Sequence, residues 1–112
     1  MDYIEYKKLI RDNIPEIILS QGKKPMISTL SELDYKTELE KKLLEECNEA
    51  IESNSDTRLE ELADVLEVVR ALCKLNGNTL EELEEVRKKK EEKNGAFNKR
   101  LFLENVIVEK QD

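Results

Sequence analysis

Residues 59–75, LEELADVLEVVRALCKL, carry the densest apolar pattern of the chain. Residues of an α-helix follow one another at about 100° around the axis. On this spacing an apolar stripe is formed by Leu59, Leu62, Ala63, Leu66, Val69 and Cys73, and it is widened by Val65, Val68, Leu72 and Leu75. Helices that are apolar over more than half of their circumference are usually buried. The sequence therefore predicts a central, largely buried helix.

A second long helix is predicted before it, from Glu32 to about Ser53, with Ser31 as its N-cap. The polar residues 54–56 form a short turn, and Asp56 or Thr57 is expected to cap the central helix. Because a short turn joins the two helices, they are expected to pack antiparallel.

Shorter elements are predicted on either side of this pair. Residues 15–21 form a short helix with Pro15 in its first turn, and residues 23–30 form an extended connection. A further helix begins at Thr79 and stops at Asn94-Gly95. The tail, residues 97–108, is expected to be an extended C-terminal arm or a short strand.

The composition indicates one all-α domain over residues 1–112. Such a small chain with few aromatic residues buries only a modest core, so a helical bundle completed by oligomerisation, as a homodimer or a dimer of dimers, is expected. The net charge of −7 argues against nucleic-acid binding. No long apolar run indicates a leader or a membrane span, and a cytoplasmic protein is expected.

Cys47 and Cys73 fall within helical, apolar patterns and are interpreted as buried, reduced thiols. The chain has no histidine. This excludes zinc sites and catalytic triads that need a histidine from the same chain.

Two carboxylates of the central helix lie on its apolar side. Glu61 projects between Val65, Val68 and Leu72, and Asp64 lies at the edge of the same arc. A carboxylate on a buried face is costly unless it is paired or bound to a metal. Since no basic residue of this helix is placed to neutralise both, the partner is either an external cation or a Lys or Arg from another helix.

The preceding helix carries Glu46 and Glu49 at the same i,i+3 spacing. Four carboxylates are thus expected to converge between the two helices. An all-oxygen ligand set suits Mg²⁺, with Mn²⁺ as a substitute. Magnesium held in this way commonly accepts phosphate oxygens, which points to phosphate ester or anhydride chemistry.

The segments EECNE at residues 45–49 and ELAD at residues 61–64 resemble the EExxE…ExxD signature of the all-α nucleoside triphosphate pyrophosphohydrolase superfamily, which includes MazG, dimeric dUTPases and phosphoribosyl-ATP pyrophosphohydrolase. KLIRDNIPEII at residues 8–18 and KNGAFNKR at residues 93–100 are similar to the flanking motifs of a MazG-like subgroup labelled phosphoribosyl-ATP pyrophosphohydrolase-like. The connection between Glu49 and Glu61 is short for the family.

The resemblance implies a MazG-type helical bundle in which Glu46, Glu49, Glu61 and Asp64 hold Mg²⁺. It implies catalytic roles for Glu46 as a metal ligand and for Glu45, which would act from outside the ligand set or orient the attacking water. It also makes phosphate-binding candidates of Lys90, Lys93 and Arg100, for which a solvated basic helix end is the other interpretation. Lys8 and Arg11 are weaker candidates, because an ion pair with Asp12 or Glu16 explains them equally well.

The implied reaction cleaves the α–β phosphoanhydride of a (deoxy)nucleoside triphosphate to a monophosphate and pyrophosphate, in a house-cleaning role. Two alternatives remain. One is the phosphoribosyl-ATP pyrophosphohydrolase of histidine biosynthesis. The other is a non-catalytic helical interaction module, which explains the acidic, Leu-rich helices without a metal.

Overall fold

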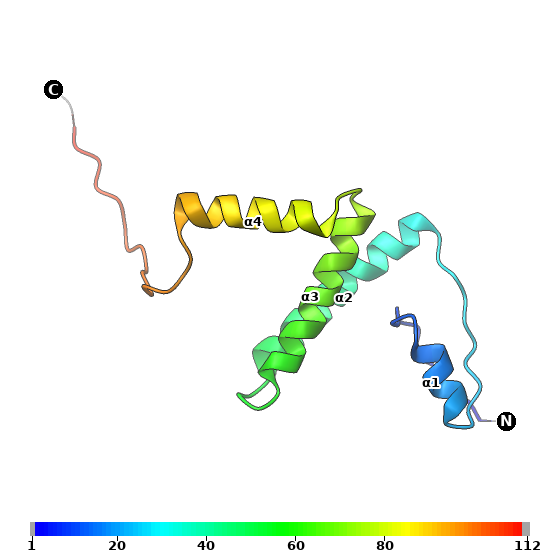
Figure 1. The fold of residues 1–112 in the computed structure, drawn as a ribbon. Helices are drawn as coiled ribbons and strands as arrows, with labels where there is room; N and C mark the ends of the chain where they lie inside the picture. The colour runs from blue at the N-terminus through cyan, green and yellow to red at the C-terminus, as the bar shows by residue number, and fades with distance from the viewer. Residues whose placement is uncertain (1, 111–112) are drawn as a thin grey trace. The chain divides into compact units, whose positions relative to one another are not determined.

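The computed structural model describes residues 2–110, which form four α-helices and no β-strand (Figure 1). The helices are α1 (Ile14–Ser20), α2 (Glu32–Glu52), α3 (Arg58–Leu75) and α4 (Leu80–Asn94). The chain divides into two compact units, Met1–Leu80 and Glu81–Asp112. The all-α prediction is confirmed. No helix within residues 2–110 combines the length and apolar character needed to cross a membrane.

The N-terminal unit is organised around a hairpin of α2 and α3, which run in opposite directions from a tight turn (Figure 1). The Asn54 side chain shapes this turn, since its Oδ1 accepts hydrogen bonds from the backbone N–H groups of Asp56 at 2.9 Å and Thr57 at 3.2 Å. Thr57 occupies the N-cap position, but its side chain makes no capping hydrogen bond. The expected side-chain capping is therefore wrong. Thr57 adopts an αR backbone instead of the extended conformation of a capping residue, and its hydroxyl donates a hydrogen bond to Asn54 Oδ1 at 3.4 Å.

Other helix ends follow the predicted signals. Ser31 Oγ accepts a hydrogen bond from the backbone N–H of Asp34 and caps α2. After α3 the N–H of Gly77 bonds to the carbonyl of Lys74, and the N–H of Asn78 bonds to that of Cys73. This pair of bonds is a Schellman motif, and it requires the left-handed φ of 86° that Gly77 adopts.

The core within residues 2–110 is small. Its buried apolar side chains are Leu39, Ala50 and Val68, at the contact between α2 and α3. The expectation that α3 is largely buried is wrong for this chain, since Leu59, Leu62 and Leu66 are between 50% and 80% exposed. The physical reason is that, within the N-terminal unit, α2 packs on one side of α3 only, and these leucines lie outside that contact.

The two cysteines are free, in agreement with the expected reduced thiols, but both are half-buried rather than buried. Cys73 Sγ donates a hydrogen bond to the Thr79 carbonyl at 3.4 Å.

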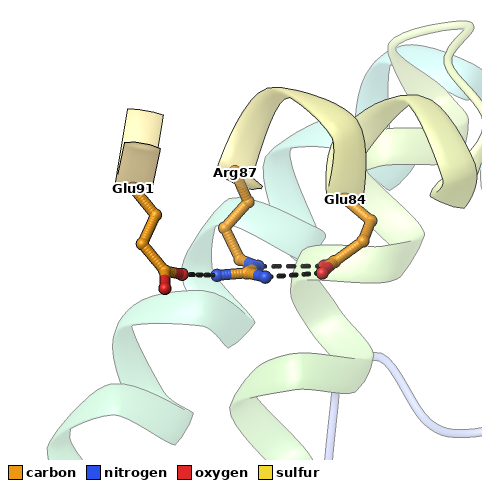
Figure 2. A network of polar contacts seen from close by, with 3 residues as sticks. All are labelled: Glu84, Arg87 and Glu91. Atoms are coloured by element: carbon orange, nitrogen blue, oxygen red, sulfur yellow. Dashed lines mark hydrogen bonds and ion pairs between the residues drawn. The ribbon is translucent and has the colours of Figure 1, made fainter. Parts of the chain in front are cut away.

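In the C-terminal unit, α4 has no buried residue, and ion pairs between its own side chains stabilise it. The Arg87 guanidinium lies between two carboxylates, 2.6 Å from Glu84 and 2.5 Å from Glu91 (Figure 2). Its hydrogen bonds to both raise the pKa of Arg87, and the bond from Arg87 lowers the pKa of Glu84. Such i,i+3 and i,i+4 pairs favour helix in an exposed segment. Residues 95–110 form neither helix nor strand, so the predicted short strand is not formed, and the chain turns where the N–H of Arg100 bonds to the Phe97 carbonyl at 3.2 Å.

Candidate metal site between α2 and α3

Three of the four predicted ligands converge on the hairpin. Glu46 of α2 and Glu61 and Asp64 of α3 each place one carboxylate oxygen within 4.8 Å of the other two. The i,i+3 spacing puts Glu61 and Asp64 on one face of α3, one turn apart. The antiparallel packing of α2 against α3 then brings Glu46 to the same place. We call these three residues the acidic cluster.

Glu61 is the member of the cluster that has a buried carboxylate oxygen without a hydrogen-bond partner among the described residues. Its Oε2 is buried, and no hydrogen-bond donor within residues 2–110 reaches it. Leaving a buried acceptor without a partner costs about 1–3 kcal/mol, and more where the group is charged. A cation bound by the acidic cluster would remove this cost.

Glu46 is the most buried carboxylate of the site, at 9% exposure. Burial raises the pKa of Glu46 above its ordinary value, and the negative charge of Glu49 raises it further. Lys42, four residues earlier on α2, opposes this effect with its Nζ 3.4 Å from the Glu46 carboxylate. A buried carboxylate with one lysine and a second negative charge nearby gains further from a divalent cation.

Asp64 is paired with a residue outside the hairpin. Arg11, in the segment before α1, donates a hydrogen bond to Asp64 Oδ1 at 2.6 Å, and both side chains are about half exposed. This pairing supports, for Asp64, the alternative that a basic residue from elsewhere in the fold neutralises the carboxylate. It also replaces the pairing of Arg11 with Asp12 or Glu16 considered from the sequence.

The other two acidic candidates lie beside the cluster. Glu49 is exposed and outside the group of three, but it is close enough to Glu46 to raise the pKa of that residue. Glu45 is exposed and lines a hollow next to α2. Their roles as a fourth metal ligand and as a catalytic carboxylate stay predictions.

The three main phosphate-binding candidates lie in the C-terminal unit, whereas the weaker candidates Lys8 and Arg11 lie in the N-terminal unit. Lys90 and Lys93 are exposed on α4, and Arg100 lies in the segment after it, with a left-handed φ of 57°. Their assignment to substrate phosphates stays a prediction.

Sequence reasoning missed Lys42, although a signal for it was present. It lies four residues before Glu46, the spacing at which opposite charges pair on a helix. It also passed over Lys7 and Lys41, which line the same hollow as Glu45. The hollow depends on how the N-terminal segment lies against α2, which no local pattern indicates.

The donor chemistry fits a hard divalent cation. Three carboxylate oxygens from two helices, without histidine or thiolate, are ligands of the kind that Mg²⁺ and Mn²⁺ prefer. Comparison of the chain with protein-family models, with curated proteins and with solved structures returned no match.

Proposed function

We propose that this protein is a Mg²⁺-dependent nucleotide pyrophosphohydrolase. It cleaves the α–β phosphoanhydride of a (deoxy)nucleoside triphosphate and releases the monophosphate and pyrophosphate. The observation that carries the proposal is the convergence of Glu46, Glu61 and Asp64, one of which has a buried oxygen without a hydrogen-bond donor.

The sequence adds the link from metal to nucleotide. The acidic cluster falls within the segments, residues 45–49 and 61–64, that resemble the signature of the all-α nucleoside triphosphate pyrophosphohydrolases. The motif-like flanks at residues 8–18 and 93–100 favour the MazG-like subgroup. Phosphoribosyl-ATP is the rival substrate within the same chemistry.

The residues divide the work as follows. Glu46, Glu61 and Asp64 would hold Mg²⁺, with Glu49 as a fourth ligand from the same face of α2. When bound, the metal would neutralise phosphate charge and favour the ionised form of a bound water. Glu45, one residue before Glu46 and exposed, would accept a proton from the attacking water.

A second copy of the chain is the proposed partner. The apolar side chains of α3 that α2 leaves uncovered, among them Leu59, Leu62 and Leu66, form a surface that a helical bundle of two or more copies would bury. The same surface also favours a non-catalytic interaction module, which makes the metal and the activity the discriminating observations.

The test is pyrophosphate release with Mg²⁺ from the common NTPs, the dNTPs and phosphoribosyl-ATP. Glu46→Gln and Asp64→Asn are expected to abolish release, whereas Glu60→Gln, on the exposed side of α3, is expected to leave it unchanged. The best substrate separates the house-cleaning and the histidine-biosynthesis roles. Absence of release from every substrate would contradict the proposal and favour the interaction module.

A further inference from the structure

A basic hollow of about 220 Å³ lies where the N-terminal segment passes α2. Its charged lining consists of Lys7, Lys8, Lys41, Lys42, Glu38 and Glu45. Four positive and two negative side chains make this lining cationic, in a chain whose net charge is −7. The electrostatic potential in the hollow is thus opposite in sign to that of the protein as a whole. Such a concave basic surface attracts small anions.

The present partners of these lysines leave them able to bind an anion. Lys41 pairs with Glu38 at 3.2 Å and Lys7 lies 3.9 Å from Glu5; both lysines and Glu5 are exposed, and Glu38 is half-buried. Lys8 lies over the Tyr6 ring. Exposed ion pairs of this kind contribute little to stability, so exchanging them for a multiply charged anion costs little.

The hollow adjoins the acidic cluster through two residues of α2. Lys42 lines the hollow and pairs with Glu46 of the cluster, and Glu45 lines the hollow one residue before Glu46. An anion in the hollow would therefore lie beside a cation held by Glu46, Glu61 and Asp64. A phosphate chain has the dimensions and charge to contact both, because its oxygens bind metal ions and lysine ammonium groups alike.

We infer that the hollow between residues 7–9 and α2 is a pyrophosphate subsite, in which Lys7, Lys8, Lys41 and Lys42 bind the pyrophosphoryl end of the substrate and the pyrophosphate product. The choice of pyrophosphate as ligand rests on the proposed function, whereas the affinity for a phosphate anion rests on the lysines alone. This subsite lies in the N-terminal unit and is distinct from the predicted contacts of Lys90, Lys93 and Arg100.

Lys42 couples the two sites. Lys42 pairs with Glu46, with its Nζ 3.4 Å from the carboxylate. A divalent cation on Glu46 replaces that charge, so Lys42 is released toward the hollow. Metal and pyrophosphate are therefore expected to strengthen each other's binding, and linkage makes that effect equal in both directions.

Inorganic pyrophosphate is the probe, titrated calorimetrically into the full chain with and without Mg²⁺. The test variant is the double substitution Lys8→Gln/Lys41→Gln. The control is Lys36→Gln/Lys74→Gln, which removes the same two charges from α2 and α3 at positions that do not line the hollow. Lys8→Arg/Lys41→Arg keeps the charges, and circular dichroism checks that each variant is folded.

Each lost charged contact is expected to weaken binding, so the test variant should bind pyrophosphate at least about tenfold more weakly. The control should bind as the parent chain does, and the arginine variant should retain most of the affinity. If the test and control variants lost pyrophosphate affinity equally, the loss would be due to net charge alone, and the subsite would be overturned. Absence of pyrophosphate binding in every condition would also overturn it.

Failure of the subsite and failure of the proposed function give different results. Mg²⁺-dependent nucleotide hydrolysis that is unchanged in Lys8→Gln/Lys41→Gln would reject the subsite and leave the enzyme. Selective pyrophosphate binding by the lysines in a chain with no hydrolytic activity would keep the subsite and reject the enzyme.

Discussion

Arg11 and Asp64, which are 53 positions apart in the sequence, are joined by a hydrogen bond of 2.6 Å. The bond ties the segment before α1 to the face of α3 that carries the acidic cluster. The guanidinium thus lies against one of the three carboxylates proposed to bind Mg²⁺, and it would compete with a metal ion for the charge of Asp64.

Replacing Arg11 by Gln is expected to affect metal binding more than stability. Both partners are about half exposed, so solvent screens the pair and its loss should lower the free energy of unfolding by less than about 1 kcal/mol. Removing the competing cation should raise the affinity for Mg²⁺, measured by calorimetry on the substrate-free protein. Lys36→Gln, which removes an equally exposed cation from α2, is the control. A lower Mg²⁺ affinity in Arg11→Gln than in the control would contradict this account of the site.

The raised pKa of Glu46 predicts a pH dependence of stability. Because the folded state binds this proton more tightly than the unfolded state, the contribution of Glu46 is favourable at low pH. That contribution is lost as the pH rises from the ordinary value of 4.5 through the raised pKa of the folded state. Glu46→Gln has no such proton to lose, so without metal its stability relative to the parent chain should increase over this interval.

The measurement is urea denaturation of both proteins at several pH values between about 4.5 and 7 with a chelator present. Glu60→Gln, at an exposed position, should show no comparable trend. The contradicting result is a free energy of unfolding of Glu46→Gln that, relative to the parent chain, stays constant or falls as the pH rises. It would show that burial of this carboxylate has no energetic consequence.

Leu39, at 3% exposure, is the most buried side chain of the small core within the described residues. Leu39→Ala is expected to lower the free energy of unfolding by about 2–3 kcal/mol, since it removes buried methyl groups and leaves a cavity. Leu33→Ala, on the same helix but 73% exposed, should change it by less than about 0.5 kcal/mol. Denaturant melts compare the two. Equal effects would mean that the contact between α2 and α3 is not the structural core.

The uncovered face of α3 predicts self-association. Leu62→Glu/Leu66→Glu places two charges on this face and should shift a dimer or larger assembly to monomer in sedimentation experiments. Thr37→Glu/Ser55→Glu adds the same charge at other exposed positions and should leave the assembly intact. A parent chain that sediments as a monomer at all concentrations would remove the proposed partner.

The sequence correctly predicted helix ends that are set by hydrogen bonds between residues close together in the chain. The Ser31 cap and the Asn76-Gly77 stop were confirmed, because each acts through hydrogen bonds within a few residues. The capping of α3 failed at Thr57 because its backbone is αR and its hydroxyl bonds to the Asn54 side chain instead of the first turn of the helix. The i,i+3 spacing of Glu61 and Asp64 together with a short connection was enough to bring both near Glu46.

Long-range contacts escaped prediction for a different reason. The pairing of Arg11 with Asp64, and the hollow between residues 7–9 and α2, depend on how the N-terminal segment returns to the hairpin. Nothing local in that segment specifies its return. The wide apolar arc of α3 predicted that the helix is buried. The sequence pattern shows which side chains share that arc, but it does not show which neighbouring element covers them.

Thermal melting with increasing Mg²⁺ shows whether the acidic cluster is a metal site. We expect Mg²⁺ to raise the melting temperature of the parent chain and of Glu60→Gln/Glu67→Gln, which removes two exposed carboxylates from α3. No such rise is expected in Glu61→Gln/Asp64→Asn. A melting temperature that Mg²⁺ leaves unchanged in the parent chain, or raises equally in all three proteins, would contradict a metal site at Glu46, Glu61 and Asp64.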